Sequence, residues 1–410
     1  MRIGVRGCLA ALGILPFCAC AAEESGEQTA SAESAVAYGA DERTDPFAVS
    51  DDVTRGLAER STAVLVSKYQ IDPQVPEWTV NPDDVRFTDE GTLGGEYQLC
   101  SDERFFNDAT AELCSAVLID DDLVLTAGHC LNRPIRWANS FWCEFQRYVF
   151  NYRNAAPSTK NAVNLADDVF ACKEVVVEVY GGEGPDGEGE DYAIVRLDRP
   201  ATPRFAPAPV KKSRSFQFDA GESITLIGSP SGMPTKIAPG TIIAPSSGTS
   251  TAVFDMNVEA MRRSSGSAVY GSTDHLLGGI LTLGPGNDYI QDPALGCYRN
   301  RVCSEAGCKD TAYPFLRGVY VAHALQAMCD LDPTNSYKLC GAYLQPGDVN
   351  GDRAVTSADA MMTAEYASGL NPTGFFPGAA DVKADGAINI VDALAIQQYV
   401  NGQIPALPIP

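Results

Sequence analysis

Short apolar runs separated by Gly, Pro, Asn and Asp dominate the chain from Ser61 onward. The clearest runs read STAVLVSKY, CSAVLIDDDLVLTA, EVVVEVY, YAIVRL, SITLIG, SAVYG and LLGGILTLG. Interrupted runs of this kind, without a long helical period, are typical of strands in an all-β barrel or sandwich. The first clear helical period comes late, in YVAHALQAMCD. The pattern therefore predicts an all-β body that ends in a helix.

A proline-rich connector divides this β-region into two halves. It reads RPATPRFAPAPV and covers residues 199–210. We therefore expect two β-subdomains within residues 45–345. Because a chain of 410 residues is too long for one compact core, we also expect further domains outside that range.

The last part of the chain contains an internal duplication. GDVNGDRAVTSADAMMTAEYASGL returns as AADVKADGAINIVDALAIQQYVNG, and the repeat pairs Asp348 with Asp381 and Asp359 with Asp392. Each copy is an acidic loop that runs into an amphipathic helix. The duplication predicts a small helical domain over residues 346–404.

The duplicated loops have the oxygen spacing of a calcium site. In such a loop, side chains at positions 1, 3, 5, 9 and 12 surround one hard cation, the ninth often through water. In the second copy Lys383 occupies position 3, which removes a ligand and adds a positive charge, so we expect that site to be weaker. The candidate ligands are Asp348, Asn350, Asp352, Thr356 and Asp359 in the first copy, and Asp381, Asp385, Asn389 and Asp392 in the second.

The N-terminus has the layout of a secretory signal. Two arginines precede an apolar stretch that is followed by small residues, and the stretch is too short to span a bilayer. We therefore expect a signal peptide over residues 1–22 and an exported protein. FCAC at 17–20 also resembles a bacterial lipobox, in which lipid on Cys20 is the one route to a membrane; plain cleavage is the alternative. Residues 23–44, rich in Glu, Ser and Ala, predict a flexible linker.

Charge and cysteine content narrow the class further. The net charge of −23 and the lack of Lys and Arg clusters exclude nucleic acid as a partner. Of 13 cysteines, three lie within the first 22 residues, and the remaining ten predict disulfides in an exported chain. The spacing of these ten does not determine which cysteine pairs with which.

The run CSAVLIDDDLVLTAGHC contains one of only three histidines in the chain. It closely resembles the first-barrel signature of the chymotrypsin-like serine proteases. That resemblance implies a double β-barrel fold, a disulfide between Cys114 and Cys130, and His129 as the general base. An imidazole suits this work because it titrates near neutral pH and can both take and return a proton.

Two later segments match the same family. EDYAIVRLD places Asp191 before a strand, where the family has the carboxylate that orients the histidine. FDMNVEAMRRSSGSAVYG resembles the nucleophile loop of the V8-like (glutamyl endopeptidase-like) branch, and Ser265 falls on the nucleophile. The resemblance therefore implies a triad of His129, Asp191 and Ser265 that needs no cofactor.

The nucleophile loop departs from the family pattern at three positions before Ser265 and at Ala268, which replaces a Pro. Arg262 and Arg263 stand where glycines are usual, and Ser264 replaces an Asn or Asp. By the resemblance, the N–H groups of Arg263 and Ser265 form the oxyanion hole. A residue with a Cβ resists the positive φ that glycine accepts, so we expect an imperfectly formed hole, or one that orders with substrate.

Specificity follows less directly from the sequence. Glu259, Thr282 and Gly284 are the candidate pocket residues. Glu259, six residues before Ser265, either favours a basic substrate side chain or is an internally paired or solvated acid. The segment GGILTLG lacks the histidine with which V8-like enzymes select glutamate, so glutamate specificity is not supported.

The two calcium-type loops, each followed by one helix, closely resemble a dockerin module. Relatives of that module bind cohesin domains and mount extracellular enzymes on scaffolds. A self-contained stabilising tail is the alternative. Together these features predict a secreted, cell-surface or periplasmic bacterial serine endopeptidase that acts on protein or peptide substrates. The alternative, motivated by the two arginines, is a catalytically impaired protease-fold binding protein presented through the dockerin-like tail.

Overall fold

The computed structural model describes most of the chain from Ala37 onward. The predicted signal peptide, Cys20, residues 23–36 of the predicted linker and the candidate ligand Asp352 lie outside the described residues. The described ranges are 37–68, 79–80, 91–110, 114–131, 141–156, 159–160, 163–180, 189–211, 216–246, 250–309, 311, 313–331, 337, 339–340, 346–350, 354–373, 375–383 and 385–407.

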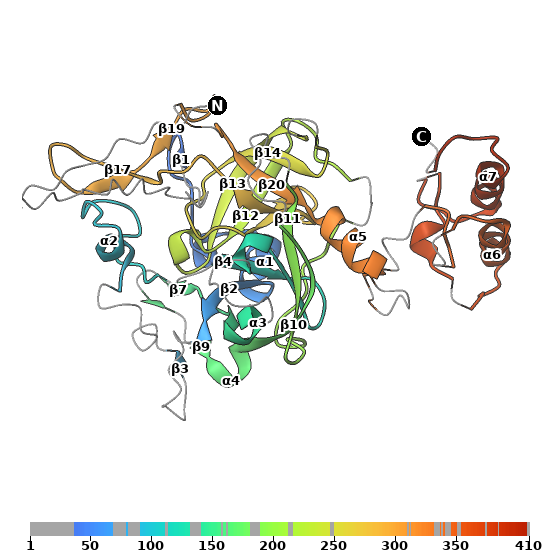
Figure 1. Ribbon diagram of the computed structural model, residues 1–410, viewed down its shortest axis with the longest axis horizontal. Coiled ribbons are helices and arrows are strands. Elements are labelled where there is room, and N and C mark those ends of the chain that lie inside the picture. Colours follow the sequence, from blue (N-terminus) through green and yellow to red (C-terminus); the bar gives the residue numbers. More distant parts are fainter. Residues whose placement is uncertain are drawn as a thin grey trace, which may run out of the picture. The chain divides into compact units, whose positions relative to one another are not determined.

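Two closed six-stranded barrels form the β-region and confirm the predicted double β-barrel (Figure 1). The first barrel, in spatial order, consists of β10 (Val169–Tyr180), β11 (Asp191–Leu197), β5 (Leu123–Thr126), β4 (Cys114–Leu118), β2 (Thr62–Ser67) and β6 (Gln146–Phe150). The second consists of β12 (Ser223–Gly228), β13 (Lys236–Ala244), β14 (Val253–Val258), β20 (Leu316–Tyr320), β16 (Leu277–Leu283) and β15 (Ala268–Gly271).

The strands read as apolar runs because both of their faces are buried. Successive side chains of a strand point to opposite faces, and in this fold they enter two different cores. Val124 of β5 packs in the cluster of the first barrel, whereas its neighbour Leu125 packs with residues of the second barrel and with α5 (Val321–Leu331). Helix α5 is the predicted closing helix, and its Leu325 and Met328 are fully buried in that shared core.

Short helices and strands lie outside the two barrel sheets. The additional helices are η1 (Pro46–Ala48), α1 (Asp52–Arg60), α2 (Leu93–Glu96), η3 (Gly128–Cys130), α3 (Phe141–Phe145), α4 (Leu165–Asp168) and η4 (Pro230–Gly232). The additional strands are β1 (Ala37–Tyr38), β3 (Thr79–Val80), β7 (Asn154–Ala156), β8 (Thr159–Lys160), β9 (Val163–Asn164), β17 (Tyr289–Gln291), β18 (Tyr298–Asn300) and β19 (Val302–Cys303).

Residues 37–44 belong to the folded body, although the sequence assigns them to the flexible linker. Strand β1 pairs in parallel with β19, and Thr44 exchanges two backbone hydrogen bonds with Ile237 of β13, at 2.8 and 2.9 Å. The Arg43 side chain is only 1% exposed and forms two hydrogen bonds with Asp41. Composition alone missed this segment because Asp41 and Arg43, two charged residues that read as linker, are packed into the folded body.

Five disulfides join the ten cysteines that follow the predicted signal peptide. They are Cys100–Cys297, Cys114–Cys130, Cys143–Cys172, Cys303–Cys308 and Cys329–Cys340. Within the described residues, no helix is both long and apolar enough to cross a membrane.

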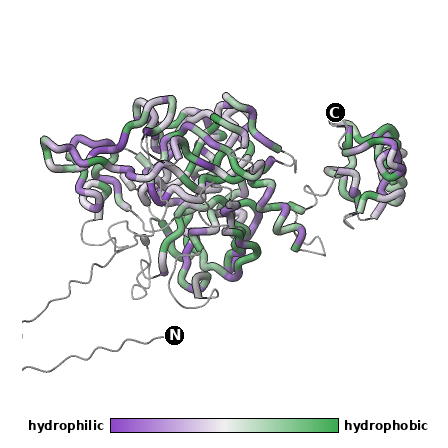
Figure 2. The backbone as a smooth tube through the Cα atoms, turned by 45° about the horizontal axis from the view of Figure 1, so that its top comes forward, coloured by the Kyte–Doolittle hydropathy of each residue, from purple (hydrophilic) through white to green (hydrophobic). Residues whose placement is uncertain are grey.

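The C-terminal helices form a module with its own small core. Helix α6 (Ser357–Ala367) packs against α7 (Ile390–Val400), and η6 (Pro377–Ala379) lies between them in sequence. Figure 2 shows hydrophobic residues (green) alternating with hydrophilic ones (purple) along the tube near the C-terminus. A capping box starts each helix, with Thr356 and Asp359 in α6 and Asn389 and Asp392 in α7. The repeated sequence thus folds into two loop–helix units, as the duplication predicts.

Candidate active site

His129 and Asp191 lie side by side at one end of the first barrel. Strands β5 and β11 pair antiparallel with Ala193 opposite Thr126, and this register brings Asp191 beside the turn that follows β5. The His129 Nδ1 atom lies 2.6 Å from Asp191 Oδ2, and the His129 backbone N–H donates to Asp191 Oδ1 at 2.8 Å. Two hydrogen bonds therefore fix the carboxylate relative to the imidazole.

Gly128 allows this close approach. A Cβ at position 128 would lie 2.3 Å from the Val179 carbonyl oxygen and 3.1 Å from Asp191 Oδ1. Any larger residue would push the histidine turn away from β10 and β11, so the glycine of the TAGHC segment is required by packing.

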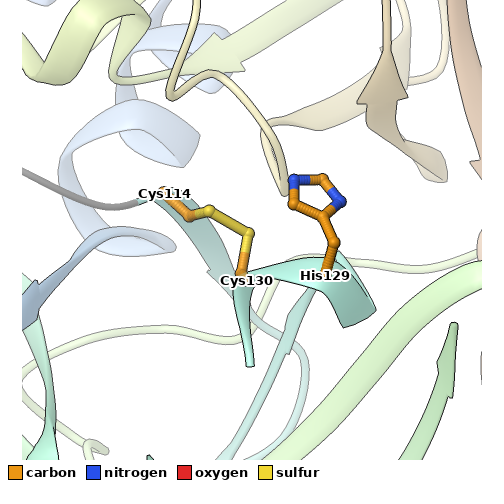
Figure 3. Close-up of side chains that lie close together, drawn as sticks. All are labelled: Cys114, His129 and Cys130. Carbon is orange, nitrogen blue, oxygen red and sulfur yellow. A yellow bond between two sulfur atoms is a disulfide. The ribbon is translucent and has the colours of Figure 1, made fainter. Parts of the chain in front are cut away.

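The other ring nitrogen of His129 is poised as an acceptor. Because Nδ1 faces a carboxylate, we assign its proton there, which leaves the lone pair on Nε2. Nε2 is buried and has no hydrogen-bond partner in the part of the chain that the structure describes. Figure 3 shows the imidazole next to the Cys114–Cys130 disulfide, which joins the start of β4 to the histidine turn.

Ser265, in the loop between β14 and β15, is docked onto the first barrel. Its carbonyl oxygen accepts the Ser115 N–H of β4 at 2.7 Å and lies 4.0 Å from Cys130 Sγ. The Cys130 sulfur in turn lies within 4.8 Å of a ring nitrogen of His129. The structure thus brings the serine loop of the second barrel to the histidine turn of the first.

Gly266 makes this docking sterically feasible. Its φ is +82°, and a Cβ at this position would lie 2.0 Å from the Ser115 carbonyl oxygen. The contact between the two barrels at this point therefore requires glycine directly after Ser265.

One of the two arginines before Ser264 adopts the positive φ that its Cβ was expected to resist. Arg263 adopts a φ of +65°, the left-handed conformation that glycine takes more easily. No backbone hydrogen bond among the described residues uses the Ser265 N–H. The loop therefore has the left-handed conformation despite the Cβ of Arg263.

Two carboxylates that the sequence does not single out contact these arginines. Glu96 Oε1 lies 2.7 Å from Arg263 Nη2, and Asp288 Oδ2 accepts the Arg262 backbone N–H at 2.8 Å. Both carboxylates lie far from the arginines in sequence, in segments without a recognisable motif, so no local pattern could have identified them.

Glu259 is buried at the end of β14, and one of its oxygens, Oε2, is buried without a described hydrogen-bond partner. Burial raises the pKa of Glu259 to about 7. A backbone hydrogen bond and the Arg43 guanidinium lower the pKa, while the Asp41 and Glu42 carboxylates raise it further. The acid is therefore about half protonated at neutral pH.

The other two candidate pocket residues lie at the end of β16. Thr282 is buried, and its hydroxyl donates to the Arg317 carbonyl at 3.4 Å. Gly284 is also buried. Leu281, the residue before Thr282, is hydrogen-bonded to the serine loop, because its carbonyl accepts the Gly266 N–H at 2.8 Å. Thr282 and Gly284 therefore follow directly on the strand segment that contacts the serine loop.

The disulfide-bonded cysteines beside His129 do not make a metal site. Cys114, His129 and Cys130 are the one group of three or more His, Cys, Asp or Glu among the described residues whose ligand-type atoms all lie within 4.8 Å of one another. Since both sulfurs are bonded to each other, neither can act as a thiolate ligand.

The first calcium-type loop is held against the start of α6. Asp348 and Asp359 are buried. Asp359 Oδ1 accepts the backbone N–H groups of Val349 and Asn350, at 2.9 and 3.2 Å. Asp359 Oδ2 accepts from Thr356, so the ends of the loop are tied together through one carboxylate. Asp348, Asn350, Thr356 and Asp359 supply the oxygen atoms that a hard cation prefers.

The second loop has the turn of a calcium loop. Gly386 at position 6 has a φ of +82°, as the sharp turn of such loops requires. Asp381 at position 1 accepts the N–H groups of Asp385 and Gly386, at 3.2 and 2.9 Å. Asp381, Asp385, Asn389 and Asp392 supply oxygen atoms of the kind that a hard cation prefers.

Comparison with known proteins identifies two domains. Residues 114–278 match the trypsin-like peptidase domain and residues 346–401 match the dockerin type I domain. The chain therefore contains a trypsin-like peptidase domain with a chymotrypsin-like fold, followed by a dockerin type I domain. Dockerin type I domains are calcium-binding modules that bind cohesin partners, and a peptidase domain implies protein substrates.

Similar solved structures include a Glu endopeptidase in complex with MPD, at 12% identity and a TM-score of 0.40, covering 72% of this chain and 98% of that one. The VesB protease of Vibrio cholerae matches at 11% identity with a TM-score of 0.39, and the match covers 70% of this chain and 65% of that one. Human heparin binding protein matches at 14% identity with a TM-score of 0.36, and the match covers 55% of this chain and 87% of that one. No curated protein matches the chain in sequence.

Proposed function

We propose that this chain is a secreted serine endopeptidase with His129, Asp191 and Ser265 as its catalytic triad. The observation that carries the proposal is the arrangement of His129, whose Nδ1 is 2.6 Å from Asp191 while its buried Nε2 has no partner among the described residues. We assign residues 45–345 to the peptidase domain, within the V8-like branch, together with residues 37–44, which pair with β19 and β13.

In this mechanism the Ser265 hydroxyl attacks the peptide carbonyl and passes its proton to His129 Nε2. The Asp191 carboxylate holds the imidazole in the correct tautomer and stabilises the imidazolium. The N–H groups of Arg263 and Ser265 stabilise the oxyanion, with about 3 kcal/mol expected from each donor. His129 then protonates the leaving amine as the C–N bond breaks. In the second half of the reaction His129 takes a proton from water, the water oxygen attacks the acyl-enzyme carbonyl, and the proton passes to Ser265 Oγ as the acyl–oxygen bond breaks.

Turnover separates this proposal from the rival, a protease-fold binding protein. The purified mature chain is incubated with denatured casein, and the products are identified by mass spectrometry. We expect new peptides that disappear after treatment with a serine-directed phosphonate. Binding of the casein without any new peptide would favour the rival.

Glu259 supports a preference for basic substrate side chains that depends on pH. Because its pKa is about 7, the carboxylate gains its charge as the pH rises from 6 to 8, from roughly one tenth to nine tenths ionised. We expect the ratio of kcat/KM for an arginine substrate to that for a leucine substrate to rise up to about tenfold over this range. The ratio cancels any effect of pH on catalysis that the two substrates share.

In the Glu259→Gln variant the same ratio should stay flat with pH. A ratio that does not change in the wild type would instead assign Glu259 to an internal role beside Arg43. The segment GGILTLG still offers no histidine for selecting glutamate.

For the dockerin domain, residues 346–404, we propose two calcium ions bound by the ligand sets of the two loops. Asp352 completes the first set. In the second loop the exposed Lys383 stands at position 3, where its ammonium group repels the cation and supplies no oxygen. The first site should therefore bind calcium more tightly than the second.

Replacing Lys383 by asparagine should strengthen the second site. Calorimetric titration of the full chain with calcium should show at least a severalfold tighter second binding step, because the variant adds an oxygen ligand and removes a positive charge. Lys173→Asn, at an exposed position of β10, is the matched control and should leave the titration unchanged. Identical titrations of wild type and Lys383→Asn would contradict the assignment of this loop.

An exposed apolar surface supports cohesin binding by this domain. Helices α6 and α7 line a shallow pocket with Met361, Ala364, Ile390 and Leu394. Met361 and Leu394 occupy equivalent positions of the two repeats and are 60% and 56% exposed. Capture of the chain by an immobilised cohesin domain should require calcium, and capture that survives chelation with EDTA would argue against a dockerin-type interaction.

Export follows from the same domains. A peptidase and a dockerin domain are typical of extracellular or cell-surface proteins, and the residues before 23 have the layout of a signal peptide. We therefore propose secretion, with lipid on Cys20 as the alternative form of attachment.

A further inference from the structure

Arg263 occupies a backbone conformation that its own side chain disfavours. Its φ of +65° is left-handed, a conformation that is disfavoured for a residue with a Cβ relative to the right-handed region. By the resemblance, the N–H of this residue belongs to the oxyanion hole, and glycine is usual at the position. Some other part of the molecule must therefore favour the left-handed conformation.

Contacts of the Arg263 side chain supply that preference. Its Nη2 lies 2.7 Å from Glu96 Oε1, and the two side chains are only 17% and 26% exposed. The second oxygen of Glu96 accepts the Thr110 hydroxyl at 2.5 Å, which fixes the carboxylate. The Tyr97 ring centre lies 5.8 Å from the Arg263 guanidinium carbon. A half-buried, hydrogen-bonded ion pair of this kind holds its geometry better than an exposed one.

Arg262 is fixed as well, by a different carboxylate. Both its backbone N–H and its Nε donate to Asp288 Oδ2, at 2.8 and 3.0 Å, and the Asp288 side chain is fully buried. The Arg262 carbonyl accepts the Ser231 N–H at 2.7 Å. The two peptide groups that flank the Arg262 Cα are therefore both anchored by hydrogen bonds.

The two carboxylates come from segments that are cross-linked to each other. Glu96 ends α2, and the Cys100–Cys297 disulfide joins the segment after α2 to the segment between β17 and β18. Backbone hydrogen bonds connect Cys100 to Tyr298 at 2.8 Å and Tyr298 to Gln98 at 2.9 Å. Asp288 directly precedes β17. Both carboxylates therefore belong to one braced unit, by which we mean residues 93–103 and 288–300 with the disulfide and hydrogen bonds that join them.

We propose that Glu96 is a positioning residue for the oxyanion hole. Its carboxylate pairs with the guanidinium of Arg263 and holds the Arg263 backbone in the left-handed conformation that presents the N–H to the oxyanion. The inference rests on the proposed function, since it assigns Glu96 to the same site. It explains how an arginine adopts the left-handed conformation at a position where glycine is usual. An ion pair between distant segments of the chain replaces the conformational freedom of glycine.

The test compares steady-state hydrolysis of a peptide amide by the wild type and by Glu96→Gln. An oxyanion donor contributes about 10²–10³ in kcat, and a donor that is loosened rather than removed should cost about tenfold. We expect kcat to fall by that factor with KM unchanged, because the ground-state carbonyl depends less on the hole than the transition state does.

Two further variants separate positioning from a general loss of structure. Arg263→Gly takes the left-handed conformation without a partner, so adding Glu96→Gln to it should lower kcat no further. Glu103→Gln removes an acid of the same braced unit that contacts Arg299 at 3.0 Å and not Arg263, and it should leave kcat near the wild-type value.

The outcomes distinguish this inference from the proposed function. An inactive wild type contradicts both. An active wild type with the same kcat as Glu96→Gln overturns the role of Glu96 alone. Equal losses in Glu96→Gln and Glu103→Gln, or a further loss when Glu96→Gln is added to Arg263→Gly, would assign the effect to the folding of the segment and overturn the positioning role.

Discussion

Ser265→Ala is expected to lower kcat for peptide hydrolysis by about 10⁶-fold. The variant removes the hydroxyl that forms the acyl-enzyme, and the remaining oxyanion donors and binding contacts support only a small residual rate above that in water. The fold should be unaffected, because the contacts that dock this residue onto the first barrel use its carbonyl oxygen, which accepts the Ser115 N–H.

Ser267→Ala is the matched control for this experiment. Ser267 lies in the same loop, is buried, and its hydroxyl donates to the Ser115 hydroxyl at 3.2 Å. We expect this variant to keep kcat within about tenfold of the wild type, since only one neutral hydrogen bond is lost. Activity that survives in Ser265→Ala, or that disappears only in Ser267→Ala, would assign the nucleophile to another residue.

Asp191→Asn should lower kcat at neutral pH by about 10⁴-fold through a change of tautomer. Asp191 Oδ1 accepts the His129 backbone N–H, so an asparagine would keep its carbonyl oxygen there and turn its NH₂ group toward Nδ1. Nδ1 would then have to accept a hydrogen bond, and the ring proton would move to Nε2. A protonated Nε2 cannot take the proton of Ser265.

Steady-state kinetics of the variant measure the loss of kcat, and its melting temperature shows whether the variant is folded. Asp198→Asn is the control, because Asp198 follows the other end of β11 and pairs with Arg199 on the surface. It should leave kcat unchanged. A kcat of Asp191→Asn within tenfold of the wild type, in a folded protein, would show that another group orients His129.

The barrels could be predicted from the sequence because their strands are buried on both faces. Val124 and Leu125 enter different cores, so β5 reads as an uninterrupted apolar run, and its neighbours do the same. Strand β13, with the sequence KIAPGTIIA, was not predicted, because Pro and Gly in its middle resemble a break between elements. Helix α1 was missed for a similar reason, since it contains Gly56.

The candidate site was only partly predictable from the sequence. His129 and Asp191 stand in recognisable segments, and their proximity follows from the pairing of the two strands that bear them. The partners of Arg262 and Arg263 could not be found in this way, since an ion pair between distant segments leaves no local pattern. The positive φ of Arg263 was expected to be resisted, and it occurs because contacts outside its own loop compensate for the Cβ.

Labelling with a fluorophosphonate probe tests the central claim most directly, since the probe reacts with a serine only when a base has activated it. The purified mature chain is labelled, digested and mapped by mass spectrometry, alongside His129→Ala. The account predicts one modified residue, Ser265, and loss of the modification in His129→Ala. A folded wild type that stays unlabelled, or labelling of Ser265 that is equal in both proteins, would contradict the assignment of the triad.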